Sequence, residues 1–181
     1  MKSHVVKRLN VAQALAIVRN GEPADAFEAA KWLIRLDERV PAGHLMNIAN
    51  DKRCARWNRI AAIHTIGLLK RRPSIAPRLI ALLADPQVNM KIRGQAAESL
   101  AYYREKAAIP LLRKILLSNE RPGLKVECIF ALSKMWEFND DLKTFDSNAR
   151  KALNRFARTQ PTGKAGQEFK RSMRAIRLGW I

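Results

Sequence analysis

The residues whose types and spacing could do chemistry in this sequence are mainly cationic. Closely spaced lysines and arginines replace the counterions of a phosphate backbone or bind carboxylates, depending on what surrounds them. In the middle of the chain this set comprises two clusters and two single lysines: Lys52, Arg53 and Arg56; Lys70, Arg71 and Arg72; Lys91; and Lys125.

The C-terminal region carries a second set of candidate cations. Lys151, Arg155 and Arg158 share one helical face, because they follow each other at i, i+4 and i+7. A second group repeats this spacing with Lys170, Arg174 and Arg177, and Arg171 lies beside it. Basic amphipathic helices of this kind bind polyanions or lie on an anionic membrane surface, and the spacing alone leaves both readings open.

Residues that could support catalysis are scattered. The three histidines, His4, His44 and His64, lie far apart, and neither they nor the two cysteines have the spacing of a zinc site. No nucleophile elbow, phosphate-binding loop or dinucleotide fingerprint is present. We therefore predict no catalytic residue, no metal site and no cofactor, and a protein that is not an enzyme. Cys54 and Cys128 are predicted to be small apolar residues rather than disulfide partners.

The charge balance points to an anionic partner. The chain has 181 residues with 34 Lys and Arg against 16 Asp and Glu, a formal net charge of +18. Residues 51–121 alone carry fifteen cations and five anions, a net +10. A protein this basic usually meets a polyanion or an acidic protein surface. The chain has 48% hydrophobic residues and no apolar run long enough to span a bilayer. We therefore expect a cytoplasmic globular protein with no membrane span.

These residues are positioned by a repeat of about 33 residues. Three apolar positions, small, medium and large, recur at i, i+1 and i+4, which makes one helical stripe. The small position is held by Ala29, Ala62, Ala96 and Cys128.

A second type of helix lies between these stripes in the same register. Leu45, Leu79 and Leu112 correspond, and Pro77 matches Pro110 at a place where a first helical turn tolerates proline. A helix pair that recurs at this period without strand patterns is typical of an α-solenoid. The sequence therefore predicts an all-α fold.

The repeat resembles a known family. Asp85-Pro86-Gln87-Val88, followed by Lys91-Ile92-Arg93-Gly94-Gln95-Ala96-Ala97-Glu98-Ser99-Leu100, is similar to the HEAT repeat, especially the short HEAT-like form of phycobilin lyases. The resemblance extends over about Pro23 to Trp136. It implies a right-handed α-solenoid in which the second helix of each pair lines the concave surface.

The resemblance also implies a structural role for four charged residues. HEAT-like repeats carry an aspartate in the turn and an arginine early in the next helix, which form a ladder of ion pairs and hydrogen bonds to turn carbonyls. Asp51 with Arg59, and Asp85 with Arg93, fit this pattern. We expect this structural ion-pair ladder in preference to ligand contact.

The predicted domain organisation is a single structural domain with three parts. Residues 1–22 form an N-terminal capping helix, which spans about 4–19. Residues 23–140 hold the HEAT-like repeats, and residues 141–181 form basic C-terminal capping helices. Because stacked repeats bring equivalent positions together, we expect Arg53, Lys70, Lys91 and Lys125 to line up as a cationic stripe.

The leading functional hypothesis is a non-catalytic module that binds the backbone of nucleic acid with low sequence specificity. It would act as a recruitment or architectural component, and we expect it to be part of a larger complex. HEAT-like alkylpurine DNA glycosylases hold a duplex in a basic concavity, but no residue here matches their catalytic carboxylate, so that activity is not carried over.

Two alternatives remain open. The first is a protein–protein adaptor whose basic groove binds an acidic protein partner. The second is an accessory protein that holds a chromophore or small ligand, as phycobilin lyases do. Trp57, Tyr102 and Tyr103 lie beside basic positions, where they would stack on bases or pack at repeat junctions.

Overall fold

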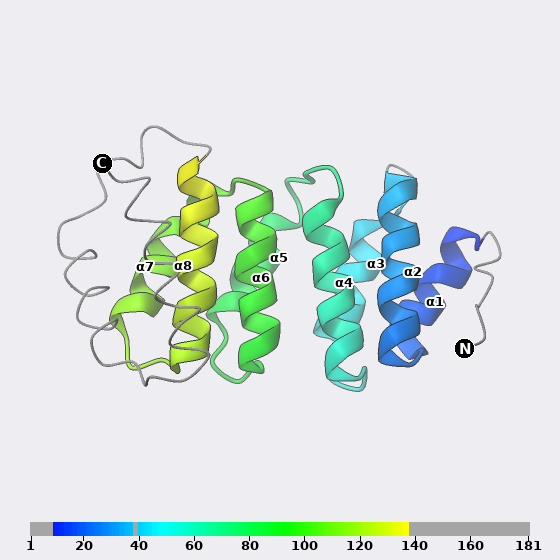
Figure 1. Ribbon diagram of the computed structural model, residues 1–181, viewed down its shortest axis with the longest axis horizontal. Helices are drawn as coiled ribbons and strands as arrows, with labels where there is room; N and C mark the ends of the chain where they lie inside the picture. Colours follow the sequence, from blue (N-terminus) through cyan, green and yellow to red (C-terminus); the bar gives the residue numbers. More distant parts are fainter. Residues whose placement is uncertain (1–8, 38–39, 138–181) are drawn as a thin grey trace. The chain divides into compact units, whose positions relative to one another are not determined.

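The computed structural model describes residues 9–37 and 40–137, and every regular element in these ranges is a helix (Figure 1). The chain divides into two compact units, Met1–Arg78 and Leu79–Ile181. The predicted all-α fold built of repeated helix pairs is confirmed. The predicted C-terminal helices and the boundary at residue 140 lie outside the described residues.

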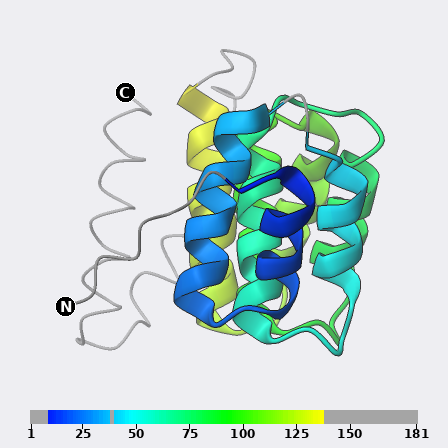
Figure 2. The same cartoon turned by 90° about the vertical axis from the view of Figure 1, so that its right-hand side faces the viewer.

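The first unit holds four helices: α1 (Val11–Asn20), α2 (Pro23–Leu36), α3 (Ala42–Asn50) and α4 (Arg56–Leu68). α2 and α4 pack side by side, while α3 packs on α4 and α1 packs on α2 and α4 (Figures 1 and 2). The long helices α2 and α4 therefore form one layer of this unit, and α4 contacts all three of the other helices.

The first helix begins later than the predicted start at residue 4. Asn10 caps α1, because its side-chain oxygen accepts the N–H of Gln13 over 2.8 Å while the Gln13 side chain accepts the N–H of Asn10 over 3.0 Å. This reciprocal capping box satisfies two N–H groups that a helix end leaves open, and it sets the start at Val11. The indole N–H of Trp32 donates to the Leu9 carbonyl over 2.7 Å and ties this entry to α2.

The second unit continues the same pattern. Its elements are α5 (Ala76–Ala84), which begins just before the boundary, α6 (Met90–Tyr102), the short 3-10 helix η2 (Lys106–Ala108), α7 (Ile109–Leu117) and α8 (Pro122–Glu137). α8 packs on both α6 and α7. Pro77 and Pro110 both lie in the first turn of a helix, as predicted.

The apolar columns of the repeat form the core. The small-residue column, which holds Ala29, Ala62, Ala96 and Cys128, is at most 2% exposed. The large apolar position four residues later in each repeat is also buried; it is held by Leu33, Ile66, Leu100 and Leu132. The helices approach closely at this stripe: a Cβ added to Gly94 on α6 would lie 2.7 Å from Cγ of Glu127 on α8.

Candidate functional site

The N-terminal end of α4 carries the first cationic cluster. Lys52 and Arg53 lie in the turn from α3, and Arg56 is the first residue of α4. All three are exposed, with the Arg53 side chain at 87%. They therefore form a cationic surface at this end of the helix.

Asp51 organises this end. Its carboxylate accepts from Arg53 Nε at 3.1 Å and from the backbone N–H of Arg53 at 3.0 Å, and it pairs with Arg19 at the end of α1. Hydrogen bonds from Arg53, first from its side chain and then from its backbone, lower the pKa of Asp51 to about 2. The carboxylate is thus ionised at neutral pH and fixes the turn between α3 and α4.

An open pocket of about 390 Å³ lies beside this turn. Asn58 lines it and ties α4 to the chain after α1, because its side-chain amide donates to the carbonyl of Gly21 over 2.8 Å. The charged groups in its wall are Arg19, Glu22, Asp51 and Arg53. Cations and carboxylates therefore meet here in equal number.

The opposite end of α4 carries the second cluster. Lys70, Arg71 and Arg72 follow α4 directly, and the first two are exposed. Asp37 holds this segment: its carboxylate accepts the backbone N–H of Lys70 over 2.9 Å, and its carbonyl accepts from Arg72 Nη2 over 3.2 Å. Arg72 is half-buried, so part of its role is structural.

Arg53 and Lys70 thus lie at opposite ends of one helix. α4 has 13 residues, which corresponds to a length of about 20 Å. Repeat-equivalent positions line up only when they lie at the same end of equivalent helices, so Lys70 does not continue a line that starts at Arg53. The two clusters instead flank α4.

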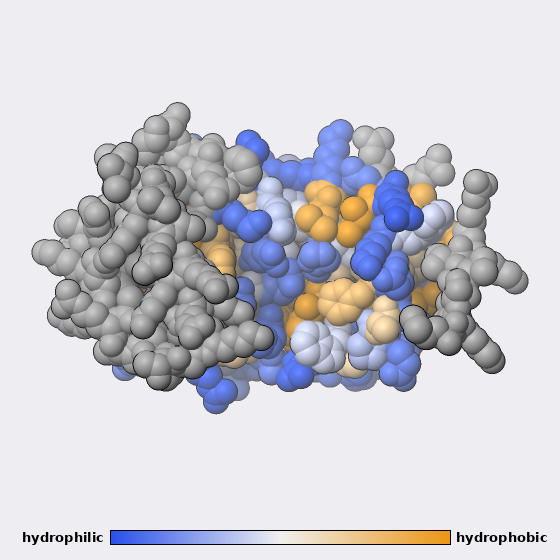
Figure 3. Space-filling view, viewed as in Figure 1, coloured by the Kyte–Doolittle hydropathy of each residue, from blue (hydrophilic) through white to orange (hydrophobic). Residues whose placement is uncertain are grey.

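Two exposed apolar side chains, which together form the apolar stripe, lie on one face of α4, one near each end of the helix. Trp57 is 43% exposed and Leu68 is 40% exposed, and they lie 11 residues apart, about three turns, on the same face. His64 falls between them and is half-exposed. The Arg56 guanidinium lies 5.1 Å from the centre of the Trp57 ring, a cation–π contact. Over α2 and α4, Figure 3 shows apolar side chains interspersed with hydrophilic ones.

In the second unit, Lys91 and Lys125 lie in the first turns of α6 and α8. These helix ends are neighbours, since a Cβ on Gly123 would lie 3.0 Å from the Met90 methyl group. A carboxylate also lies here: burial raises the pKa of Glu127, and Lys91 opposes that shift. Lys91 therefore faces an internal anion.

The C-terminal candidates lie outside the described residues. These are Lys151, Arg155, Arg158, Lys170, Arg171 and Arg174.

Three comparisons place the chain among known proteins. A family model described as HEAT repeats matches residues 42–133, which is half of the chain. The chain belongs to the HEAT-repeat family. No curated protein matches. HEAT repeats form protein-interaction and scaffold modules, because stacked helix pairs expose long surfaces.

The fold is also that of a solved HEAT-type structure. The chain is similar to one in the complex of CpcE and CpcF of phycocyanin lyase from Nostoc sp. PCC7120, with a TM-score of 0.52 and 16% sequence identity. The alignment covers 97% of this chain and 98% of that chain. The predicted resemblance to HEAT-like repeats of the phycobilin-lyase type is confirmed for the fold.

The two HEAT arginines make equivalent hydrogen bonds to turn carbonyls. Arg59 Nε donates to the Ala49 carbonyl over 2.7 Å, and Arg93 Nε donates to the Leu83 carbonyl over 2.9 Å. Each acceptor lies ten residues before its arginine. Each bond satisfies a carbonyl at the end of the first helix of its pair.

The ion pairs in the structure differ from those of the expected ladder. Asp51 pairs with Arg19 and Arg53 instead of Arg59, because it lies within reach of both. Arg93 pairs with Glu120 over 2.7 Å, and the Asp85 carboxylate accepts the backbone N–H of Gln87 over 2.8 Å. The aspartates therefore brace their own turns, as an Asx-type contact does.

The two tyrosines among the aromatic candidates differ in their exposure to solvent. Tyr103 is buried at 4% exposure, whereas Tyr102 is exposed and the ammonium of Lys134 lies 4.5 Å from the centre of its ring. Sequence reasoning missed the roles of Lys134, Arg19 and Glu120. Their partners lie 27 to 32 residues away, and no local spacing signals such contacts.

Two absences concern the part of the chain that the structure describes. No group of three His, Cys, Asp or Glu side chains in it is arranged to hold a metal ion. None of its helices is long and apolar enough to cross a bilayer.

Proposed function

We propose that this protein is a non-catalytic HEAT adaptor and that α4 docks a segment of an acidic protein partner. The observation that carries the proposal is the arrangement along α4, where two exposed apolar side chains on one face, Trp57 and Leu68, lie between two cationic clusters. A segment with apolar residues between acidic ends complements this surface.

The electrostatic part of this surface attracts anions at both ends. At the N-terminal end, Arg19, Lys52, Arg53 and Arg56 outnumber the carboxylates of Glu22 and Asp51. At the C-terminal end, three cations follow α4 from Lys70 to Arg72, and the carboxylate of Asp37 accepts the backbone N–H of Lys70. Such charges steer association and fix the register of a partner more than they add affinity.

The apolar part supplies the contact area. Trp is among the residues most enriched at interaction hot spots, because it buries a large surface at a low entropy cost. Burying the exposed parts of Trp57 and Leu68 contributes at roughly 25 cal/mol per Å² of apolar surface. The partner segment that spans this stripe is about 14 residues long if it is helical, since each residue rises about 1.5 Å.

The same arrangement favours a protein over nucleic acid. A phosphate backbone is bound by successive cations along its path. Here the two clusters lie about 20 Å apart, with apolar side chains between them. Apolar residues at that position can pack against apolar side chains of a protein partner. A phosphate backbone has no apolar side chains against which they could pack.

The test uses a labelled helical peptide of about 14 residues with glutamates at both ends and leucines on one face in the middle. Fluorescence anisotropy measures its affinity for the whole protein, next to a scrambled peptide of the same composition and a random-sequence DNA duplex. We expect the patterned peptide to bind at least about tenfold more tightly than the scrambled one.

Charge-reversal variants locate the binding surface. The double variant Lys70→Glu with Arg71→Glu keeps the hydrogen bond from Arg72 to Asp37. It is expected to weaken binding of the patterned peptide by about tenfold. The double variant Lys52→Glu with Arg56→Glu is expected to have the same effect. The matched control is Lys31→Glu with Arg35→Glu on the exposed face of α2. Equal affinity for both peptides, or an equal loss with the α2 control, would contradict the proposal.

A further inference from the structure

Arg93 is a buried cation with unused hydrogen-bonding capacity. Its side chain is 5% exposed, and it contacts the Leu83 carbonyl through Nε and the Glu120 carboxylate through Nη2. A guanidinium has five N–H groups, so these two contacts use two of them. The other three have no acceptor among the residues that the structure describes.

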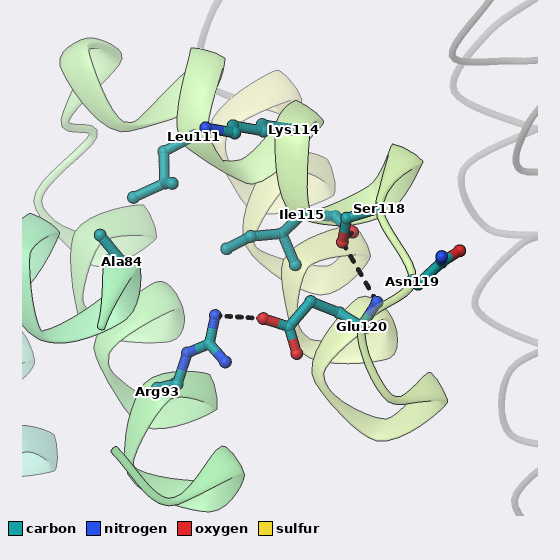
Figure 4. A pocket seen from close by; sticks show the side chains of 8 residues that line it. All are labelled: Ala84, Arg93, Leu111, Lys114, Ile115, Ser118, Asn119 and Glu120. Atoms are coloured by element: carbon teal, nitrogen blue, oxygen red, sulfur yellow. Dashed lines mark hydrogen bonds and ion pairs between the residues drawn. The ribbon is translucent and has the colours of Figure 1, made fainter. Parts of the chain in front are cut away.

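A cavity opens beside this guanidinium. Its volume is about 380 Å³, which lies within the range of small-molecule sites. Figure 4 shows the Arg93 guanidinium directed into it from α6, with side chains of α7 and of the loop before α8 around it. Ala84, Leu111 and Ile115 provide an apolar wall, and Lys114 adds a second cation.

The charges around the cavity leave room for one anion. Arg93 and Lys114 supply two positive charges, and Glu120 is the one carboxylate in the lining. The Glu120 carboxylate already occupies one position on Arg93, which shows that a carboxylate fits the guanidinium. Its side chain is 27% exposed, so it reaches Arg93 from the mouth of the cavity rather than filling it.

We propose that this cavity binds a small carboxylate that carries an apolar stem. The carboxylate pairs with the free edge of the Arg93 guanidinium, the stem lies against Leu111 and Ile115, and Lys114 adds a second positive charge to the wall across the cavity. This site belongs to the second unit, and it is independent of the proposed docking surface on α4.

The loop that carries Glu120 makes it an internal competitor. Ser118 shapes this loop, because its hydroxyl donates to the Ile115 carbonyl over 2.7 Å and accepts the backbone N–H of Glu120 over 3.2 Å. Glu120 is thereby held near Arg93, where it competes with an entering carboxylate. Removing its charge while keeping its shape strengthens the site for an anion.

The test titrates the whole protein with hexanoate and follows the side-chain Nε–H signal of Arg93 and the backbone amide of Glu120 by NMR. Hexanamide, which has the same stem without the charge, is the matched control ligand. We expect hexanoate to bind this open site in the millimolar range, so the titration extends to tens of millimolar.

Two variants make the result decisive without removing the buried arginine. Glu120→Gln is expected to tighten hexanoate binding several-fold, whereas Lys114→Glu is expected to weaken it several-fold. Lys106→Glu in η2, whose lysine does not line the cavity, is the control and leaves the affinity unchanged. The proposal is overturned if hexanoate shifts neither signal in the wild type and in Glu120→Gln, or if hexanamide shifts them equally.

Discussion

The Nε–H of Arg93 donates to the carbonyl of Leu83 over 2.9 Å, across the turn that joins α5 to α6. Arg59 makes the same bond to Ala49 in the first unit. These bonds brace the helix pair from within. They differ in burial, because Arg93 is 4% exposed while Arg59 is half-buried.

This difference predicts unequal costs of truncation. Arg93→Met is expected to lower the free energy of unfolding by about 3 kcal/mol, because it leaves the Leu83 carbonyl and Glu120 without their partner. Arg59→Met is expected to cost about 1–2 kcal/mol, since only a carbonyl loses its donor and water reaches it.

Urea denaturation of each variant measures both values. Arg78→Met, which removes an exposed contact to Asn47, is the control and is expected to change stability by less than about 0.5 kcal/mol. A cost for Arg93→Met as small as that of the control would show that the bond does not brace the repeat.

The pKa of Asp51 predicts a pH-dependent contribution to stability. The folded pKa of about 2 lies below the ordinary value of 3.8. The ionised carboxylate therefore stabilises the fold above about pH 4, and this contribution is lost as the pH falls toward 2. Asp51→Asn should accordingly be less stable than the wild type at neutral pH, and the difference should shrink over this window. A difference that stays constant down to pH 2 would contradict the assignment.

For Glu127, the predicted change of stability with pH has the opposite sign to that for Asp51. Burial beside Gly94 raises its pKa above 4.5, so the folded state disfavours the ionised form. Stability from this residue therefore increases as the pH falls through its raised pKa, and the protonated form is tolerated below 4.5.

Glu127→Gln keeps the shape of the side chain and removes its charge. It is expected to raise the urea midpoint at neutral pH and to have no effect once the wild-type carboxyl is protonated. A lower midpoint at neutral pH would mean that the Lys91 contact outweighs the cost of burial.

The two cysteines should react at very different rates. Cys128 is fully buried, and burial raises its thiol pKa to about 12, so neither access nor ionisation favours reaction. Cys54 is half-buried in the turn before α4, and burial raises its pKa as well. With a thiol reagent, Cys54 is expected to react first in the native protein, and Cys128 only on unfolding. Native-state labelling of Cys128 as fast as that of Cys54 would contradict the packing of α8.

Much of the fold could be predicted from sequence because it follows from local periodicity. The column from Ala29 to Cys128 identified the buried stripe of the repeat, and the two prolines marked helix starts correctly. These features depend on residues that recur at fixed spacing, which a single sequence displays.

The partners of the charged residues could not be predicted in the same way. Glu120 reaches Arg93 across 27 residues, and Arg19 reaches Asp51 across 32, through loop geometry that has no local sequence signal. The position of Lys70 at the far end of α4 from Arg53 depended on where that helix begins and ends. Helix boundaries are the least certain part of any sequence-based prediction.

The apolar part of the docking surface predicts a loss of binding on truncation. Trp57→Ala is expected to weaken the patterned peptide by about tenfold, because Trp57 supplies most of the exposed ring surface on α4. Tyr102→Ala, which removes an exposed ring in the second unit, is the matched control and should leave the affinity unchanged. An equal loss in both variants would place the binding elsewhere.

The affinity of the patterned peptide for Leu68→Lys tests the central claim most directly. This substitution adds a positive charge beside Lys70 and removes apolar surface from the stripe on α4. If an acidic protein segment docks on that stripe, the affinity for the peptide falls by about tenfold while the affinity for duplex DNA does not fall. If the affinity for the peptide instead rises together with the affinity for DNA, binding depends on charge alone and the account is wrong.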